Sequence, residues 1–166
     1  MSISPEAEVV QPGDLAAFGA RQRAAGRRLV LTNGCFDLIH PGHLALLRQA
    51  ATLGDVLVVG VNSDAGVHRL KGPGRPLMSL EDRLVVLQAV RWVGAVTPFD
   101  EATADRLIEQ LRPAHYVKGA DYDPSAGGTT LPETATLKRL GVPVVYVPLT
   151  PGQASSELIA RSRRHT

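Results

Sequence analysis

The sequence predicts an open, mostly parallel α/β sheet of about five strands with helices on both faces. Three observations predict it. Short apolar runs alternate with amphipathic helical patterns, the order that produces parallel strands joined by crossover helices. Residues 55–61 form a continuous apolar run, which is typical of a strand buried on both faces. The length of 166 residues fits one domain with one core.

The first half of the chain predicts an arm, a helix, a strand, a helix and a strand. Residues 1–12 are polar and unpatterned, which is typical of a mobile arm, so the domain is expected to cover residues 13–166. Asp14 suits the cap of the first helix, Pro41 suits the first turn of the second, and Gly54 suits its end. The expected elements are a helix from 15 to near Gly26, a strand at 28–32, a helix at 41–53 and a strand at 55–61.

The second half continues the alternation after a long loop. Residues 63–78 contain three glycines and two prolines and predict a functional loop. Ser79 with Asp82, and Thr130 with Glu133, match capping boxes that open helices. The remaining elements are strands at 95–98, 115–117 and 144–147, helices at 80–90, 102–111, 130–141 and 155–161, and a second loop at 119–129. Together they predict a Rossmann-like sheet, whose ligands lie beyond the carboxyl ends of the strands.

The segment TNGCFDLIHPGH at residues 32–43, here called the phosphate loop, carries the strongest functional signal. His40 and His43 flank Pro41 and Gly42 where a strand gives way to a helix. Free N–H groups and the helix dipole favour an anion at such a terminus. Gly42 lets a phosphate come close to the backbone. The alternative is a pair of capping or surface histidines, but the surrounding loop favours phosphate binding.

H-x-G-H after a first strand resembles the signature of nucleotidyltransferases that join a nucleoside monophosphate to a phosphorylated acceptor. Further matches are VNSD at 61–64, RLKGPGRP at 69–76, residues 80–83 and VKGADY at 117–122. Over residues 29–161 the chain resembles the adenylyltransferase half of ADP-heptose synthases. The resemblance implies transfer of AMP from ATP to a sugar 1-phosphate, most of all D-glycero-D-manno-heptose 1-phosphate. The kinase half of that family is absent, so a separate kinase is expected to supply the acceptor.

The resemblance and the loop chemistry together predict the residues that handle phosphate. His40, His43 and Lys71 are expected to be catalytic; Lys71 lies in a basic, glycine-flanked loop that can close over a triphosphate, although most short basic clusters are only exposed loops. Arg83 falls in the first turn of a helix, a poor place for a cation, which favours a phosphate partner. Nucleotide and phosphate binding is expected at Thr32, Asn33, Gly34, Cys35, Phe36, Gly42, Arg83, Lys118, Gly119, Ser155 and Ser156.

Polar side chains at the strand ends are candidates for binding the acceptor. Asn33 and Asp37 could orient its hydroxyls or could hold the loop through local bonds, and the sequence leaves both open. The same alternatives hold for Asn62 and Asp64. Asp121 could accept a bond from a ribose or substrate hydroxyl, or could cap the turn around Gly119. The predicted acceptor-binding residues are Asp37, Asn62, Asp64 and Asp121.

The late part of the chain departs from the family pattern. Relatives commonly carry a serine-threonine-threonine run there, whereas this chain has Gln153, Ala154, Ser155 and Ser156. The last two hydroxyls can still cap a helix and touch phosphate. A cytidylyltransferase acting on glycerol 3-phosphate is the nearest alternative function, and a non-catalytic nucleotide-binding module is another.

Composition limits the remaining classes. The 18 Lys and Arg nearly balance the 16 Asp and Glu, and aromatic residues make up 4% of the chain, so a nucleic-acid partner is not expected. The single cysteine, Cys35, excludes an internal disulfide and a cysteine-rich metal site. It could be a nucleophile, but nothing around it suits acyl transfer, which favours a loop-packing role.

No residue pattern predicts a metal site, and Mg²⁺ is expected to arrive with ATP. The chain has no signal pattern at its N-terminus and no apolar run long enough to span a bilayer, so a cytoplasmic protein without a membrane partner is expected. A homodimer is compatible with the sequence.

Overall fold

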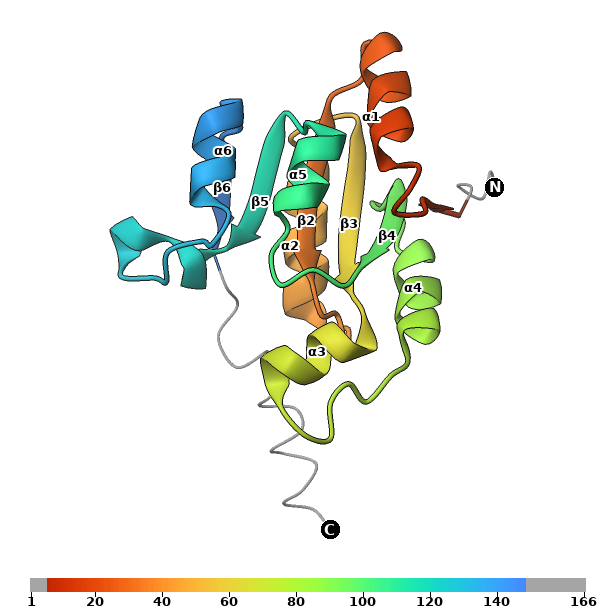
Figure 1. The fold of residues 1–166 in the computed structure, drawn as a ribbon, viewed down its shortest axis with the longest axis vertical. Coiled ribbons are helices and arrows are strands. Elements are labelled where there is room, and N and C mark those ends of the chain that lie inside the picture. The colour runs from red at the N-terminus through yellow and green to blue at the C-terminus, as the bar shows by residue number, and fades with distance from the viewer. Residues whose placement is uncertain (1–5, 149–166) are drawn as a thin grey trace.

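A six-stranded, all-parallel sheet organises residues 6–148, the part of the chain that this computed structural model describes. The strands lie in the order β1-β4-β3-β2-β5-β6 (Figure 1). The order reverses at β2, which pairs with both β3 and β5. The strands are β1 (Glu8–Val9), β2 (Leu29–Gly34), β3 (Val56–Asn62), β4 (Ala95–Phe99), β5 (His115–Gly119) and β6 (Val144–Val147).

Helices cover both faces of the sheet because each central strand buries side chains on both sides. Leu31 packs in one apolar cluster with side chains of α1, α5 and α6, while Val30 packs in a second cluster with side chains of α2 and α4. This confirms the predicted α/β architecture. The helices are α1 (Leu15–Ala24), α2 (Pro41–Ala51), α3 (Asp64–Lys71), α4 (Leu80–Gln88), α5 (Asp105–Leu111) and α6 (Thr134–Leu140), with 3₁₀ turns at Ala120–Tyr122 and Pro124–Ala126.

The sixth strand comes from the segment that the sequence predicts to be an arm. Glu8 and Val9 pair in parallel with β4, and Ala7 and Val10 are buried on either side of them. The prediction of a mobile arm is therefore corrected for residues 7–10: a short edge strand, stabilised by two buried apolar side chains, extends the sheet.

The predicted functional loop at 63–78 is also corrected, since its first half is helix α3. Ser63 caps this helix: its Oγ accepts a hydrogen bond from the Gly66 N–H at 2.9 Å. Gly72, with a φ of 83°, ends it in a conformation that suits glycine. Lys71 is thus the last residue of a helix rather than part of a loose loop.

Three capping predictions are wrong. Asp14 occupies the N-cap position of α1, but its side chain makes no capping hydrogen bond. Helix α2 ends at Ala51, and Gly54 is required instead for close packing, because a Cβ there would lie 2.6 Å from the Arg28 carbonyl oxygen. Glu133 occupies the N-cap position of α6 without capping it, since its side chain bonds elsewhere. The box at Ser79 is confirmed, with its Oγ accepting from the Asp82 N–H.

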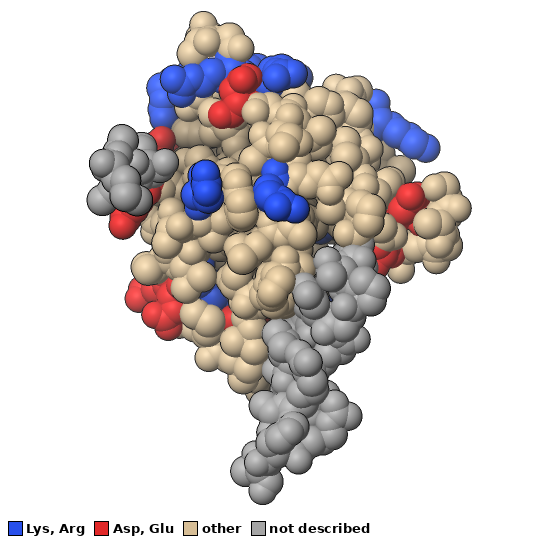
Figure 2. Space-filling model, turned by 180° about the vertical axis from the view of Figure 1, so that it is seen from behind, with Lys and Arg blue, Asp and Glu red and all other residues tan. Residues whose placement is uncertain are grey.

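The helices within residues 6–148 are too short or too polar to cross a membrane. Figure 2 shows the side of the molecule that faces away from the viewer in Figure 1, and this side is mostly uncharged. Its Lys and Arg side chains gather mainly at the upper end, away from the end where α3 lies in Figure 1.

Candidate active site

A cavity of about 650 Å³ opens at the carboxyl ends of β2, β3, β4 and β5. This is the position expected for a ligand in an open parallel sheet, next to the reversal of strand order at β2. Two parts of the chain face each other across it. The phosphate loop and the start of α2 form one side. The other side, called the far wall, combines residues from the end of β4 and the turn after it with residues just before α6. The far wall consists of Phe99, Ala102, Thr103, Leu131, Pro132 and Glu133.

The phosphate loop is held in a special backbone conformation. Phe36 has a φ of 48°, in the left-handed region that non-glycine residues rarely adopt. Its ring is buried, packs against Gly34, and lies 5.1 Å from the His43 ring, centroid to centroid. Such outliers persist only where surrounding contacts hold them, and they concentrate at functional sites.

His40 and His43 stack at the N-terminus of α2 with their ring centroids 3.8 Å apart. His40 is the N-cap residue, and its Nδ1 accepts a hydrogen bond from the His43 N–H at 3.4 Å. Burial lowers the pKa of both rings; for His43, burial and the neighbouring His40 bring the pKa to about 4. Both rings are therefore neutral hydrogen-bond donors at pH 7, placed where helix N–H groups favour an anion.

Asp37 fastens the phosphate loop to the segment after α3. Its carboxylate, with 1% of the side chain exposed, accepts hydrogen bonds from Arg75 Nε at 2.5 Å and from the Leu77 and Met78 N–H groups at 2.7 and 2.9 Å. Burial opposes ionisation of Asp37, but the bonds from Met78, Arg75 and Leu77 outweigh it and lower the pKa. The carboxylate thus holds the loop, through partners about 40 residues away rather than local ones.

Asp64 and Arg83 lie behind the phosphate loop and do not line the cavity. Arg83 is fully buried and donates to the Cys35 carbonyl at 2.5 Å, the Met78 carbonyl at 3.2 Å and the Asp64 carboxylate at 2.7 Å. A buried guanidinium with three such partners stabilises the loop and is not presented to a phosphate in the cavity. In the first turn of α4, the charge of Arg83 is thus paired with the Asp64 carboxylate.

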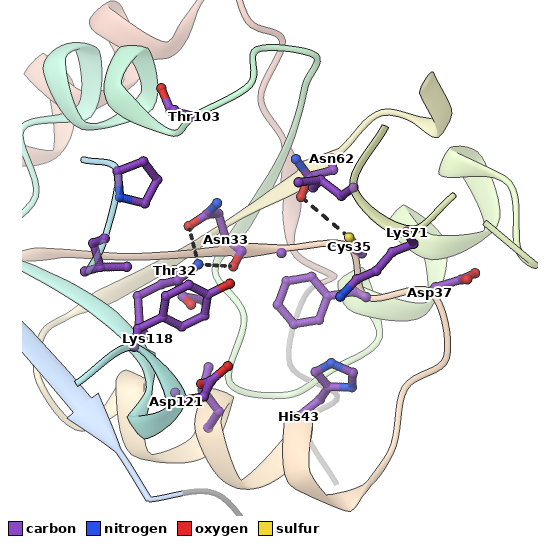
Figure 3. Close-up of a pocket in the computed structure, with 18 of the residues that line it drawn as sticks. Thr32, Asn33, Cys35, Asp37, His43, Asn62, Lys71, Thr103, Lys118 and Asp121 are labelled. Carbon is purple, nitrogen blue, oxygen red and sulfur yellow. Dashed lines mark hydrogen bonds between the residues drawn. The ribbon is translucent and has the colours of Figure 1, made fainter. Parts of the chain in front are cut away.

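Asn33 is locked in one orientation by β5. Its Oδ1 accepts a hydrogen bond from the Tyr116 hydroxyl at 2.6 Å. Lys118 Nζ donates to the same Oδ1 at 3.2 Å and to the Asn33 carbonyl at 3.3 Å (Figure 3). The amide nitrogen therefore remains as a donor at the cavity, with no bond to any described residue. Burial lowers the pKa of Lys118, while the nearby Glu133 and Asp121 act in the opposite direction.

The far wall is the part of the site that sequence reasoning missed. Thr103 lies across Asn33 from His43 (Figure 3), and Phe99 and Leu131 are buried beside the cavity. Glu133 is also buried, and its Oε1 accepts from the Ala104 N–H at 2.8 Å. The only sequence signal here is the apparent capping box, which identifies Glu133 as ordered but assigns it the wrong partner.

Most of the predicted site residues come together at the cavity. Cys35 lies there with its Sγ 3.9 Å from Asn62 Oδ1, and burial raises the pKa of its thiol, so it is protonated at neutral pH, in line with a packing role. Ser155 and Ser156, and the predicted helix at 155–161, lie outside the described residues. The predicted residues that line the cavity are Thr32, Asn33, Gly34, Cys35, Phe36, Asp37, His40, Gly42, His43, Asn62, Lys71, Lys118, Gly119 and Asp121.

Comparison with known proteins agrees with this geometry. A family described as cytidylyltransferase-like matches residues 31–161. The chain is 49% identical to the bifunctional protein HldE of Streptomyces coelicolor over 149 residues and 45% identical to that of Azorhizobium caulinodans over 161 residues. These alignments cover 90% and 97% of this chain but 31% and 33% of the relatives, so the chain spans about a third of their length.

A solved structure shares the fold. The lipopolysaccharide core biosynthesis protein from Thermoplasma volcanium superposes with a TM-score of 0.59 and 25% identity, covering 75% of this chain and 98% of that one. The sheet, the paired histidines at a helix terminus and the family match over most of the chain lead to one assignment. The chain belongs to the cytidylyltransferase-like family of nucleotidyltransferases, which confirms the family and the enzyme class that its sequence motifs predict.

Proposed function

We propose that the protein transfers AMP from ATP to D-glycero-D-manno-heptose 1-phosphate, forming ADP-heptose and pyrophosphate. The observation that carries this proposal is the pair of stacked histidines at the N-terminus of α2, beside Lys71, on a cavity large enough for a nucleotide and a sugar phosphate. The identity with bifunctional HldE proteins supports the choice of an adenylyl donor and a heptose acceptor.

The reaction needs alignment and positive charge more than covalent help. An oxygen of the acceptor phosphate attacks the α-phosphorus of ATP, a new P–O bond forms, and the bond to the bridging oxygen breaks, so that the electron pair leaves with pyrophosphate. The attacking oxygen is already anionic and needs no general base. The site must hold the groups in line and stabilise the charge that develops.

The described residues suit this task. His40 and His43 donate to the α- and β-phosphates, and bound phosphate raises their pKa values, because a nearby anion favours the imidazolium. Lys71 adds a cation from the end of α3, and Asn33 adds a fixed amide donor. Asp37 keeps the loop in position through Arg75 and two backbone N–H groups, and so acts as a positioning residue.

The proposal also covers the metal ion, the source of the acceptor, the cellular location and the oligomeric state. No group of three or more His, Cys, Asp or Glu within residues 6–148 is arranged to hold a metal. Mg²⁺ is proposed to arrive with ATP and to be bound mainly by the triphosphate and water, where it would neutralise phosphate charge. A separate kinase would supply the sugar 1-phosphate. A cytoplasmic location and a homodimer are also proposed, and gel filtration with light scattering tests the latter.

A panel of nucleotides and acceptors tests the function. Pyrophosphate release is measured with ATP, CTP, GTP and UTP, each combined with heptose 1-phosphate, hexose 1-phosphates and glycerol 3-phosphate. We expect the highest kcat/KM for ATP with heptose 1-phosphate. Turnover with CTP and glycerol 3-phosphate alone would replace this proposal by the cytidylyltransferase. Tight ATP binding without release for any acceptor would indicate a non-catalytic module.

A further inference from the structure

Glu133 has a carboxylate oxygen without a protein partner. The residue is 3% exposed and lines the cavity. Its Oε1 accepts from the Ala104 N–H, which fixes the side chain, whereas Oε2 is buried and has no hydrogen-bond partner among the described residues. A buried acceptor left in this state destabilises the folded protein, so its retention requires a reason.

Three donors near the far wall, on Thr103, Tyr116 and Lys118, direct their hydrogen bonds to residues other than Glu133. The Thr103 hydroxyl donates to Asp105 Oδ2 at 2.5 Å, and the Tyr116 hydroxyl donates to Asn33 Oδ1. Lys118 Nζ directs its bonds to Asn33 as well. Glu133 Oε2 therefore accepts no hydrogen bond from any described residue, although it lies on the wall of the cavity.

The charge and the surroundings of Glu133 Oε2 indicate which kind of chemical group would bind to it. A carboxylate repels phosphate and accepts from donors, so the partner is not a phosphate group. Phe99, Leu131 and Pro132 line the same cavity as Glu133, and their apolar surfaces suit the C–H face of a sugar ring. Thr103 of the same wall lies across Asn33 from His43 (Figure 3). The far wall is thus separated from the predicted phosphate position.

We propose that Glu133 is a specificity-determining residue that accepts, through Oε2, a hydrogen bond from a sugar hydroxyl of a bound substrate. The inference rests on the proposed function, which brings two sugars to the cavity, the ribose of the nucleotide and the acceptor sugar. Both offer the same hydroxyl chemistry. A site built to bond a hydroxyl strongly rejects an analogue that lacks it, because the protein group is then left unpaired.

Glu133→Gln is the decisive variant, since it can keep the acceptor for Ala104 and replaces only the second oxygen by an amide. Glu109→Gln is the matched control, because Glu109 makes an exposed ion pair with Arg139 on the neighbouring helices. Thermal unfolding establishes that both variants fold. We expect Glu133→Gln to raise the KM of one substrate about 10- to 100-fold, the range for a hydrogen bond to a charged group, with Glu109→Gln unchanged.

Deoxy analogues then identify the sugar. 2′-Deoxy- and 3′-deoxy-ATP remove ribose hydroxyls, and deoxy sugar 1-phosphates remove those of the acceptor. One analogue should be penalised by the wild type and not by Glu133→Gln. Equal KM values in the two proteins for both substrates would overturn the inference, and so would a wild type that tolerates every deoxy analogue. A penalty found only when ITP replaces ATP would also overturn it, because ITP changes the base and not the sugar.

Failure of the proposed function gives a different result. A wild type that releases no pyrophosphate overturns that function, and calorimetric titration of ATP, sugar 1-phosphates and their deoxy analogues still decides the role of Glu133. If Glu133→Gln does not fold, the same analogue series on the wild type and a crystal structure with ADP-heptose decide it. A structure in which Oε2 faces no hydroxyl contradicts the inference.

Discussion

The phosphate loop and the far wall face the same cavity but are built in different ways. The loop places two histidines and two glycines in twelve consecutive residues, between a strand and a helix. The far wall joins residues from before α5 and before α6, linked by the bond from the Ala104 N–H to Glu133, 29 positions apart. The residues proposed to bind phosphate are thus close together in the sequence, whereas the surface proposed to recognise the sugar is formed only by folding.

The largest effect should come from the phosphate loop, through His43→Ala. Removing one preorganised donor to the transition state costs about 100- to 1000-fold in kcat, or about 2.7–4 kcal/mol. Steady-state pyrophosphate release measures it, with circular dichroism to verify the fold. His68→Ala, an exposed histidine on α3, is the control. A His43→Ala enzyme near the wild-type rate would remove His43 from the mechanism.

The depressed pKa of His43 predicts a second, slightly smaller effect on stability. The folded protein takes up this proton only near pH 4, while the unfolded chain takes it up below its ordinary value of 6.5. Stability is therefore lost as the pH falls, by up to about 3 kcal/mol between pH 7 and pH 4. Urea unfolding of the wild type should show this loss, and His43→Asn should lack it. Parallel pH profiles would contradict the prediction.

Asp37→Asn tests whether the loop depends on its long-range fastening. The amide oxygen can still accept from Leu77 or Met78, but the charge that pairs with Arg75 is lost. We expect the free energy of unfolding to fall by about 2 kcal/mol, the order of a hydrogen bond between charged groups. Denaturant titration measures it. Asp55→Asn, which removes an exposed pair with Arg28, should leave stability nearly unchanged; an equal loss in both variants would refute the role of Asp37.

The smallest effect is expected for Tyr116→Phe, which deletes one hydrogen bond to Asn33 and preserves the buried ring. The free energy of unfolding should fall by about 1 kcal/mol, and kcat/KM should fall because the Asn33 amide loses one of its two anchors. Tyr146→Phe on β6 is the control, since its hydroxyl makes no hydrogen bond to a described residue. A Tyr116→Phe variant with unchanged stability and kinetics would show that Lys118 alone orients Asn33.

Sequence reasoning recovers the sheet because periodic burial and turn residues are local signals. Val56–Asn62 and the capped start of α4 lie within one residue of their expected positions. It also finds the phosphate loop, whose chemistry is contained in adjacent residues. It does not anticipate the ion pair between Arg83 and Asp64, because this pair joins two elements that are brought together only by folding. The sequence does not identify Glu133 as a site residue for the same reason: its bond to Ala104 exists only in the folded chain.

Helix α3 changes what nucleotide binding has to accomplish. Ser63 at the start of α3 and Arg69 in its last turn both bond to Asp100, and beyond the end of the helix Asp37 holds Leu77 and Met78. A loop that closed over a triphosphate would lose about 1–2 kcal/mol of backbone conformational entropy for each residue it ordered. The backbone that carries Lys71 has already lost that freedom during folding. In the proposed reaction the charge of Lys71 would meet the phosphates with only side-chain motion to restrict, so ordering of this backbone would not reduce the binding free energy.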